Sequence, residues 1–257
     1  MPELPDVEGF RRYLARYAAG QRVGRVEVRD AVLVRNASPR ALGRALAGAQ
    51  LGDPRRHGKW VIAPADGVAL AMHFGMTGLL HWTAGDAPAH PHDRVVLHCE
   101  SGRLAYRNMR KFGGVWLARE PDASDVTGPL GPDALDVDAT LFEELLARRR
   151  AGIKAALMDQ TLIAGLGNLL VDEILWRARV RPRTRIERLS GPRRRRIHDE
   201  MEATLRESVP TARVPSKPGW LTTVRDEREP RCPRCGRGLR RETVAGRTTV
   251  WCPRCQR

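Results

Sequence analysis

The sequence predicts an α+β protein in three parts: a β-rich amino-terminal part, a helical part, and a short tail that carries cysteines. Three observations lead to this prediction. Short apolar runs bounded by Gly, Pro or Asp occupy residues 21–118, which is typical of strands. After residue 138 the apolar residues recur every three or four positions, as they do in amphipathic helices. Two Cys-Pro-Arg-Cys segments then follow in the last part of the chain.

An amino-terminal helix is expected over residues 5–19. Its apolar residues repeat at spacings of three and four, and Pro5 lies in the first turn, where proline is tolerated. This stripe consists of Val7, Phe10, Leu14 and Tyr17. A packed helix at this point would hold residues 2 and 3 in a fixed position.

The β-rich part, residues 1–119, is expected to form a β-sandwich of two layers. Many short strands separated by turn residues favour two packed sheets. The expected strands are residues 23–28, 59–62, 67–72, 94–98 and 114–117, with a short helix over 39–46 between them.

A linker is expected over residues 120–138, which are rich in Pro, Gly and Asp. A helical domain over 139–225 and a tail domain over 226–257 would follow it. The expected helices of that domain are residues 140–149, 153–158, 168–178 and 193–209.

The charge balance points to a polyanionic partner. The chain has 257 residues, with 45 Lys and Arg against 30 Asp and Glu, which gives a net charge of +15. Such an excess suits nucleic acid or an anionic membrane surface. No apolar run approaches the ~20 residues of a membrane span, and no secretion signal is evident, so we expect a cytoplasmic protein.

The two cysteine pairs predict a metal site. Sixteen residues separate Cys235 from Cys252, and each pair spans a tight turn. Four thiolates at this spacing suit one tetrahedral zinc ion with a structural role, held on a β-hairpin that turns at Ala245-Gly246. The alternatives are disulfides or cysteines without a common role. The site consists of Cys232, Cys235, Cys252 and Cys255, whereas Cys99 is expected to be buried in a strand.

The first residues combine an amine with an acid. If Met1 is removed, Pro2 presents a free secondary amine beside the carboxylate of Glu3. A terminal amine has a pKa of about 8, so part of it is neutral and nucleophilic near neutral pH. Such an amine suits attack on a masked aldehyde through a Schiff base. Proline at position 2 is also common without any catalytic role, and five residues alone do not decide between these interpretations.

Several other segments carry residues suited to DNA contacts. Lys59 lies on a turn before a strand, and Met76 lies between glycines. Arg110 and Phe112 lie two residues apart in an expected loop, where exposed side chains could fill the hole left by an extruded base. The alternatives are a solvated Lys59 and core packing for Met76 and Phe112.

In the helical part, a glycine-rich turn precedes Asn168, which is a suitable N-cap for the next helix and leaves its N–H groups open to phosphate. The alternative is an ordinary connection between helices. Arg247 on the hairpin is a candidate phosphate contact or a plain surface residue. The run 193–196 of four arginines is interpreted as a solvated helix face, with DNA contact as the second interpretation.

Taken in order, these segments resemble the formamidopyrimidine-DNA glycosylase family, which also contains endonuclease VIII-like enzymes. The resemblance covers nearly the whole chain and is closer to the formamidopyrimidine branch because residue 4 is leucine. It rests on Pro2-Glu3-Leu4-Pro5, Lys59, Gly75-Met76-Thr77-Gly78, Arg110-Lys111-Phe112-Gly113, Leu130-Gly131-Pro132, the segment 158–168 and the four cysteines.

The resemblance implies an amino-terminal β-sandwich, a helix–two-turn–helix domain and a zinc finger, with double-stranded DNA bound between the domains by a monomer. It implies a base-excision-repair glycosylase with abasic-site lyase activity. Pro2, Glu3 and Lys59 would then be catalytic. The DNA contacts would be Met76, Arg110, Lys111, Phe112, Lys154, Asn168 and Arg247.

Three other functions are compatible with the sequence: a catalytically weak protein of this fold that binds damaged or abasic DNA, an endonuclease VIII-like oxidised-pyrimidine glycosylase, and an unrelated zinc-ribbon module. The segment 215–220 differs in composition from the family's loop over an extruded 8-oxoguanine. The sequence therefore leaves the preferred base, the opposite-base preference, the extent of elimination and the processing of Met1 open.

Overall fold

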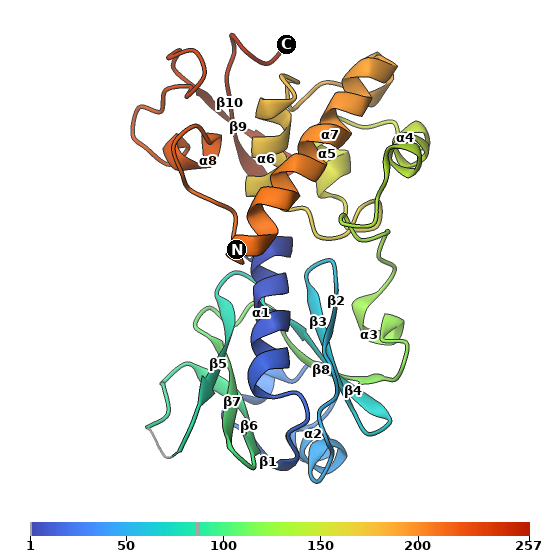
Figure 1. Ribbon diagram of the computed structural model, residues 1–257, viewed down its shortest axis with the longest axis vertical. Helices are drawn as coiled ribbons and strands as arrows, with labels where there is room; N and C mark the ends of the chain where they lie inside the picture. The colour runs from blue at the N-terminus through green and yellow to red at the C-terminus, as the bar shows by residue number, and fades with distance from the viewer. Residues whose placement is uncertain (1, 86–87) are drawn as a thin grey trace. The chain divides into compact units, whose positions relative to one another are not determined.

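The computed structural model describes residues 2–85 and 88–257, and it divides into two compact units (Figure 1). Unit 1 holds Pro2 and Asp6–Pro129, and unit 2 holds Glu3–Pro5 and Leu130–Arg257. Met1, on whose removal the catalytic hypothesis depends, lies outside the described residues. The fold class is α+β, as predicted.

Unit 1 contains two antiparallel sheets of four strands each. The first has the order β1-β6-β7-β5 and the second the order β2-β3-β4-β8. The strands of the first sheet are β1 (Val23–Val28), β5 (Gly78–Thr83), β6 (Asp93–Cys99) and β7 (Gly102–Asn108). Those of the second are β2 (Arg55–His57), β3 (Trp60–Ala65), β4 (Val68–His73) and β8 (Gly114–Arg119).

One apolar core joins the two sheets of unit 1. Leu97 and Leu104 from the first sheet share it with Val61 and Met72 from the second. Helix α1 (Leu4–Tyr17) adds Val7 and Leu14, and helix α2 (Pro39–Leu46) adds Leu42 and Leu46. A shared core between two sheets is the defining feature of a β-sandwich.

The sequence prediction missed three strands of unit 1. β7 pairs with both β5 and β6, so it is a central strand of its sheet. Its sequence, GRLAYRN, interrupts the apolar residues with arginines on the outer face. β5 carries a histidine and begins at a glycine, and β2 has only three residues, all of them basic. None of the three is a clear apolar run, which explains the omission.

Unit 2 is helical and ends in a β-hairpin. Its longer helices are α4 (Ala139–Ala147), α5 (Ile153–Met158), α6 (Asn168–Arg177) and α7 (Gly191–Ser208). The hairpin consists of β9 (Arg240–Val244) and β10 (Arg247–Trp251). Short helical pieces lie at α3 (Ser124–Thr127), which belongs to unit 1, and at α8 (Leu221–Val224) in unit 2.

α6 lies at the centre of the unit 2 core. Leu170, Val171, Ile174 and Leu175 on this helix are buried, and they pack with residues of α4, α5 and α7. A second, smaller cluster joins Trp176 of α6 to Leu221 of α8, Val250 of the hairpin and two of the cysteines. α6 therefore connects the helical core to the cysteine-bearing tail. None of the described helices is long and apolar enough to cross a membrane.

Candidate active site and zinc centre

The carboxylate of Glu3 is held at the beginning of α6. Glu3 is buried, and its two carboxylate oxygens accept hydrogen bonds from the backbone N–H groups of Leu169 (2.8 Å) and Leu170 (3.0 Å). These are free donors at a helix amino terminus, where the helix dipole also favours a negative charge. The residue that follows Pro2 is thus fixed by two charge-assisted hydrogen bonds within unit 2.

A glycine turn before α6 makes room for this carboxylate. A methyl group at Gly167 would collide with the Glu3 side chain, and one at Gly165 would lie 2.6 Å from Leu4 Cδ1. Gly165 also has φ of +108°, which disfavours any other residue, and its carbonyl accepts the Leu4 N–H at 3.1 Å. The two glycines are therefore required by the close approach of Glu3 and Leu4.

The predicted N-cap role of Asn168 is wrong. Gly167 is the N-cap of α6, and Asn168 is its first helical residue. Glu3 supplies the anion that a capping side chain would otherwise provide. The Asn168 side chain turns the other way, where its amide donates to the carbonyl of Thr248 at 2.9 Å and its oxygen accepts from Lys154 at 2.7 Å.

Lys154 on α5, which the family resemblance implies to be a DNA contact, is fully buried. Its Nζ donates to Asn168 Oδ1, to Asp172 Oδ1 at 2.6 Å and to Thr249 Oγ1 at 2.7 Å. An ammonium has three donors, so these bonds satisfy all of them. In this arrangement Lys154 positions Asn168, Asp172 and Thr249 relative to one another.

Asp172 extends this buried network to the hairpin and to Arg225, the residue after α8. Its second oxygen accepts from the Val250 N–H at 3.2 Å and lies 3.2 Å from Arg225 Nη1. Burial lowers the pKa of Lys154, and the adjacent Asp172 carboxylate opposes that shift. Burial likewise raises the pKa of Asp172, against the effect of Lys154 and Arg225. The network therefore depends on keeping its opposite charges together.

Arg247 lies at the first position of β10, next to the hairpin turn. It is exposed and pairs with Val244 across the hairpin. Its carbonyl accepts from Thr249 Oγ1 at 3.1 Å, and Thr249 is the residue bound by Lys154. The buried network thus fixes the strand that presents Arg247 to solvent.

In unit 1, two loops form one platform beside the β-sandwich. The loop after β4 contains Met76, and the loop before β8 contains Arg110 and Phe112. A methyl group at Gly75 would collide with the Phe112 carbonyl, so the loops touch through their backbones. Phe112 is 51% exposed and Met109 is 55% exposed, whereas Met76 is half-buried. The Arg110 guanidinium lies 5.3 Å from the centre of the Phe112 ring.

Asn108 supports this platform from below. It is completely buried, and its amide donates to the Phe112 carbonyl at 2.6 Å and to the Tyr106 hydroxyl at 3.0 Å. Its oxygen accepts from the Lys111 N–H at 2.9 Å and from Thr77 Oγ1 at 3.2 Å. Met109 and Phe112 thereby stay exposed on a loop that does not collapse onto the core.

The remaining candidates of unit 1 differ in their surroundings. The Lys111 ammonium lies 2.8 Å from Asp30, and Lys111 itself has a positive φ of 58°. Lys59 lies on the turn between β2 and β3, close enough to His73 to lower the pKa of that ring, although burial is the larger cause. Pro2 is half-buried.

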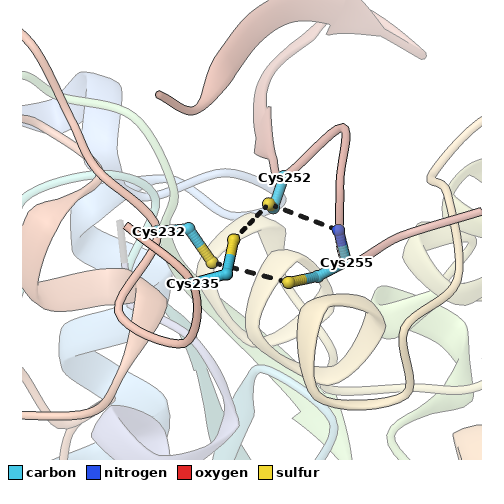
Figure 2. A group of neighbouring side chains, drawn as sticks. All are labelled: Cys232, Cys235, Cys252 and Cys255. Carbon is cyan, nitrogen blue, oxygen red and sulfur yellow. Dashed lines mark hydrogen bonds between the residues drawn. The ribbon is translucent and has the colours of Figure 1, made fainter. Parts of the chain in front are cut away.

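The four tail cysteines converge on one point, as Figure 2 shows. Their sulfur atoms lie within 4.8 Å of one another, with 3.9 Å between Cys232 and Cys255 and 3.6 Å between Cys235 and Cys252. Tetrahedral zinc with bonds of about 2.3 Å requires sulfurs about 3.8 Å apart. The cluster therefore fits one structural zinc ion, as predicted. None of the described cysteines forms a disulfide.

Sequence reasoning missed the residues that support the site. Asn108, Asp172 and Arg225 are polar or charged, and all three are buried. Asp172 and Arg225 come from segments far apart in the chain, so no local pattern marks their contact. Asn108 binds mainly residues within four positions of itself, but nothing in the sequence shows that its amide is buried beneath them. Met109 was also missed, although it directly precedes the predicted Arg110 and its exposure is an outlier for a large apolar side chain.

Comparisons with known proteins match the chain along its whole length. The chain matches three family models: the formamidopyrimidine-DNA glycosylase N-terminal domain (residues 1–115), the formamidopyrimidine-DNA glycosylase H2TH domain (130–217), and the zinc finger found in FPG and IleRS (230–257). It is 35% identical over 272 residues to the formamidopyrimidine-DNA glycosylase of Methylococcus capsulatus, with both chains covered completely. The Rhodococcus jostii enzyme of the same name is 32% identical and is covered to 96% of its length by this whole chain.

Solved structures give the same picture. The Lactococcus lactis formamidopyrimidine-DNA glycosylase, non-covalently bound to DNA that contains an abasic site, has a TM-score of 0.87 at 31% identity. The same enzyme in complex with DNA containing an oxidised pyrimidine has a TM-score of 0.90 at 31% identity. Each comparison covers 99% of both chains.

Proposed function

The chain belongs to the formamidopyrimidine-DNA glycosylase family, and from this premise we propose that the amine of Pro2 is its reacting group. The protein is a base-excision-repair DNA glycosylase that also has abasic-site lyase activity. The observation that carries the assignment of residues is the binding of Glu3, next to Pro2, at the amino terminus of α6.

In the proposed reaction the Pro2 nitrogen forms a bond to C1′ of the damaged nucleotide. The bond from C1′ to the base breaks, and the base leaves with that electron pair and takes up a proton. The amine nitrogen loses its proton, and the bond from C1′ to the ring oxygen breaks as that oxygen takes up a proton. The resulting iminium ion acidifies the C2′ proton. Loss of this proton and of the 3′ phosphate cuts the strand by elimination, and water then releases the enzyme.

Glu3 is proposed to transfer protons during these steps, first to the sugar oxygen as the ring opens. A proton carrier must stay within hydrogen-bond reach of the reacting atoms. The two N–H donors of α6 and the tight fit at Gly167 hold the carboxylate in one position. Lys59, on its turn beside His73, is proposed to bind a phosphate or to assist proton transfer.

The remaining candidates are proposed to grip duplex DNA with a damaged base. Met76, Arg110 and Phe112 would fill the space left by the extruded nucleotide, which suits the exposed ring of Phe112. Lys111, Asn168 and Arg247 would contact phosphates, and Lys154 would position Asn168 and the hairpin. The four cysteines hold a closed zinc site, so the metal stabilises the tail and takes no part in the chemistry.

The DNA bound in the solved relatives supports damaged or abasic duplex DNA as the partner. We further propose that the protein acts as a monomer in the cytoplasm and that the chain's own residues, rather than a second copy, complete the site.

The test is to trap the imine with borohydride on DNA that contains an abasic site. Protein whose terminus is Pro2 should form a covalent adduct with the strand. Pro2→Gly should give much less adduct, and a form with Met1 retained should give none, because its terminal amine is displaced by one residue. Tight binding without any adduct from the Pro2 terminus would contradict the proposal and favour a damage-binding protein.

Gly167→Ala tests the position of Glu3. The residue has φ of −124° and ψ of −170°, which alanine adopts without strain, so the change acts through the clash with Glu3 alone. We expect cleavage of damaged DNA to slow by roughly 100-fold while the Pro2 amine stays free for trapping. Gly191→Ala, which meets no atom within 4 Å, is the matched control. Normal cleavage by Gly167→Ala would contradict a role for the fixed carboxylate.

A further inference from the structure

Unit 2 has an arginine-lined hollow at the carboxyl end of α6. Its volume is about 860 Å³, and no Asp or Glu is among the described residues that line it. Its arginines come from five places: the second residue after α6, the first turns of α7, each of the two cysteine turns, and the end of the described chain. They are Arg179, Arg193, Arg196, Arg234, Arg254 and Arg257.

The beginning of α7 contributes an unfavourable arrangement of charge. Arg193 to Arg196 occupy the first turns of this 18-residue helix, and its first turn has no acidic residue. The positive end of a helix dipole repels cations. Arg194 turns away to the carbonyls of Ile186 and Leu189, while Arg193 and Arg196 face the hollow. An anion in the hollow would relieve this repulsion.

The positive surface continues past the hollow. A second depression of about 810 Å³ shares Cys235 and Arg254 with the first and has a single acid, Glu229, against five arginines. These are Arg228, Arg231, Arg237, Arg240 and Arg254. At the junction, Arg234 is held in place because its guanidinium stacks 4.4 Å from the Trp176 ring centre and donates to the Trp176 carbonyl. The two hollows form one extended strip, which we call the arginine strip.

The arginine strip lies away from the unit 2 residues assigned to the lesion. Glu3 and Asn168 are at the amino end of α6, and the hollow begins at Ala178 and Arg179, past its other end. Ten helical residues span about 15 Å. Arg247 is likewise at the turn end of the hairpin, whereas Arg240 and the cysteine turns are at the opposite end.

We propose that the arginine strip binds the sugar–phosphate backbone of a second segment of duplex DNA. An acidic protein segment would also match its charge, but protein partners usually insert apolar or aromatic anchors into pockets. The described large apolar side chains that are exposed are Val32, Met109, Phe112 and Leu135, and none belongs to the strip. Guanidinium groups on a surface that lacks these exposed apolar side chains suit repeated phosphates and sequence-independent contact.

The experiment measures a second binding event on the full-length, zinc-loaded protein. The protein is first saturated with one equivalent of duplex carrying an uncleavable abasic analogue, and a labelled undamaged duplex is then titrated at low salt. We expect a 1:2 complex whose second step weakens steeply with salt. Arg193→Glu/Arg196→Glu should weaken this step at least tenfold and reduce its salt slope by about 2, at roughly 0.9 per lost phosphate contact. Affinity for the first duplex should stay within about twofold, since other residues bind it.

The matched control is Arg40→Glu/Arg44→Glu. These exposed arginines also lie on a helix with proline in its first turn, α2 in unit 1, and they give the same change in net charge. Binding of a second duplex that is absent from the wild type, or reduced equally by both variants, would overturn the proposal. So would tight binding of polyglutamate that duplex DNA does not displace. Failure of borohydride trapping would bear on the role of Pro2 and not on this proposal, since the arginine strip does not involve Pro2.

Discussion

The two units present their functional residues in opposite ways. In unit 1 the groups assigned to the lesion are on the surface: Phe112 is 51% exposed, and its support, Asn108, is buried beneath it. In unit 2, Lys154, which is also among the proposed DNA-binding residues, is completely buried. Its three donors bind only protein groups. Unit 1 exposes its proposed contact groups, and unit 2 buries the charge of Lys154, which positions the proposed contact groups of unit 2.

This difference suggests a division of labour. Phe112, which we call the proposed wedge, must enter the duplex, so its side chain has to protrude. The buried amide of Asn108 keeps the loop that carries it from collapsing onto the core. The proposed phosphate contacts, Asn168 and Arg247, need a fixed spacing between a helix and a hairpin that are far apart in sequence. The ion pair between α5 and α6, together with the hydrogen bond from Lys154 to Thr249 of β10, sets that spacing at the cost of burying charge.

Removal of zinc should show the largest difference between the two units. Structural zinc contributes about 10–16 kcal/mol to small finger domains, so chelation should unfold the hairpin and release Thr249 from Lys154. We expect duplex affinity to fall by roughly 100-fold while the sheets of unit 1 keep their far-ultraviolet signal and melting temperature. Cys99→Ser, which alters a cysteine outside the cluster, is the control. Loss of unit 1 structure on chelation would contradict this separation.

Breaking the buried ion pair should have the next largest effect. Lys154→Met leaves Asp172 buried with only Arg225 as a charged partner, and we expect the free energy of unfolding to fall by about 3 kcal/mol. Asp172→Asn should cost a similar amount, because it leaves the Lys154 charge buried. Chemical denaturation of both single variants and of the double variant measures the coupling.

The double variant should be more stable than the sum of the single losses predicts, because the second change removes a charge that the first left unpaired. Strict additivity would mean that the pair contributes nothing as a unit. An unchanged stability in Lys154→Met would contradict the buried-pair arrangement itself.

Local sequence patterns predicted most helices and strands, but not the buried polar residues that hold the candidate site in place. The helix over 39–46 and the strand over 23–28 were predicted with their observed ends, since apolar spacing and flanking turn residues are local signals. The zinc site was predicted from cysteine spacing for the same reason. β7 was missed because arginines on its outer face hide its alternation.

The candidate site shows where such reasoning stops. Residue type identified Asn168 as a helix cap, but Glu3, 165 positions earlier in the chain, provides the anion instead, and no local pattern reveals that contact. The burial of Lys154 depends on Asp172 and Thr249, which come from two other elements. Charge alone predicts exposure for a lysine, and only the tertiary partners reverse it.

In unit 1 the comparison predicts opposite phenotypes for two neighbouring residues. Asn108→Ala removes a buried amide and leaves the Tyr106 hydroxyl, the Lys111 N–H and the Phe112 carbonyl without it, so the unfolding free energy should fall by about 3 kcal/mol. Phe112→Ala should change stability by no more than about 0.5 kcal/mol, since the ring is exposed.

Binding should rank these two variants the other way. Phe112→Ala loses a stacking group worth about 1–3 kcal/mol and should weaken binding to damaged duplex by roughly tenfold. Titration of abasic-analogue duplex, with thermal melting alongside, measures both quantities. If Phe112→Ala destabilises the protein as much as Asn108→Ala, the ring is part of the core and the wedge assignment is wrong.

The smallest expected effect concerns the pH dependence of unit 1. Burial, and then the nearby Lys59 ammonium, lower the pKa of His73 to about 4 from 6.5. The unfolded chain therefore binds a proton at His73 as the pH falls below 6.5, while the folded chain resists until about pH 4. The stability that the neutral His73 contributes is complete above pH 6.5 and should decline by about 2 kcal/mol between pH 7.5 and 5.

His73→Asn keeps an acceptor for the Gly75 N–H but cannot titrate, so its unfolding free energy should fall less over this interval. Urea denaturation at several pH values measures the two slopes, and equal slopes would show that His73 is free to protonate in the folded chain. Because the Met76 loop begins at this histidine, such a result would also mean that the platform under the proposed wedge is more open to water than its backbone contacts indicate.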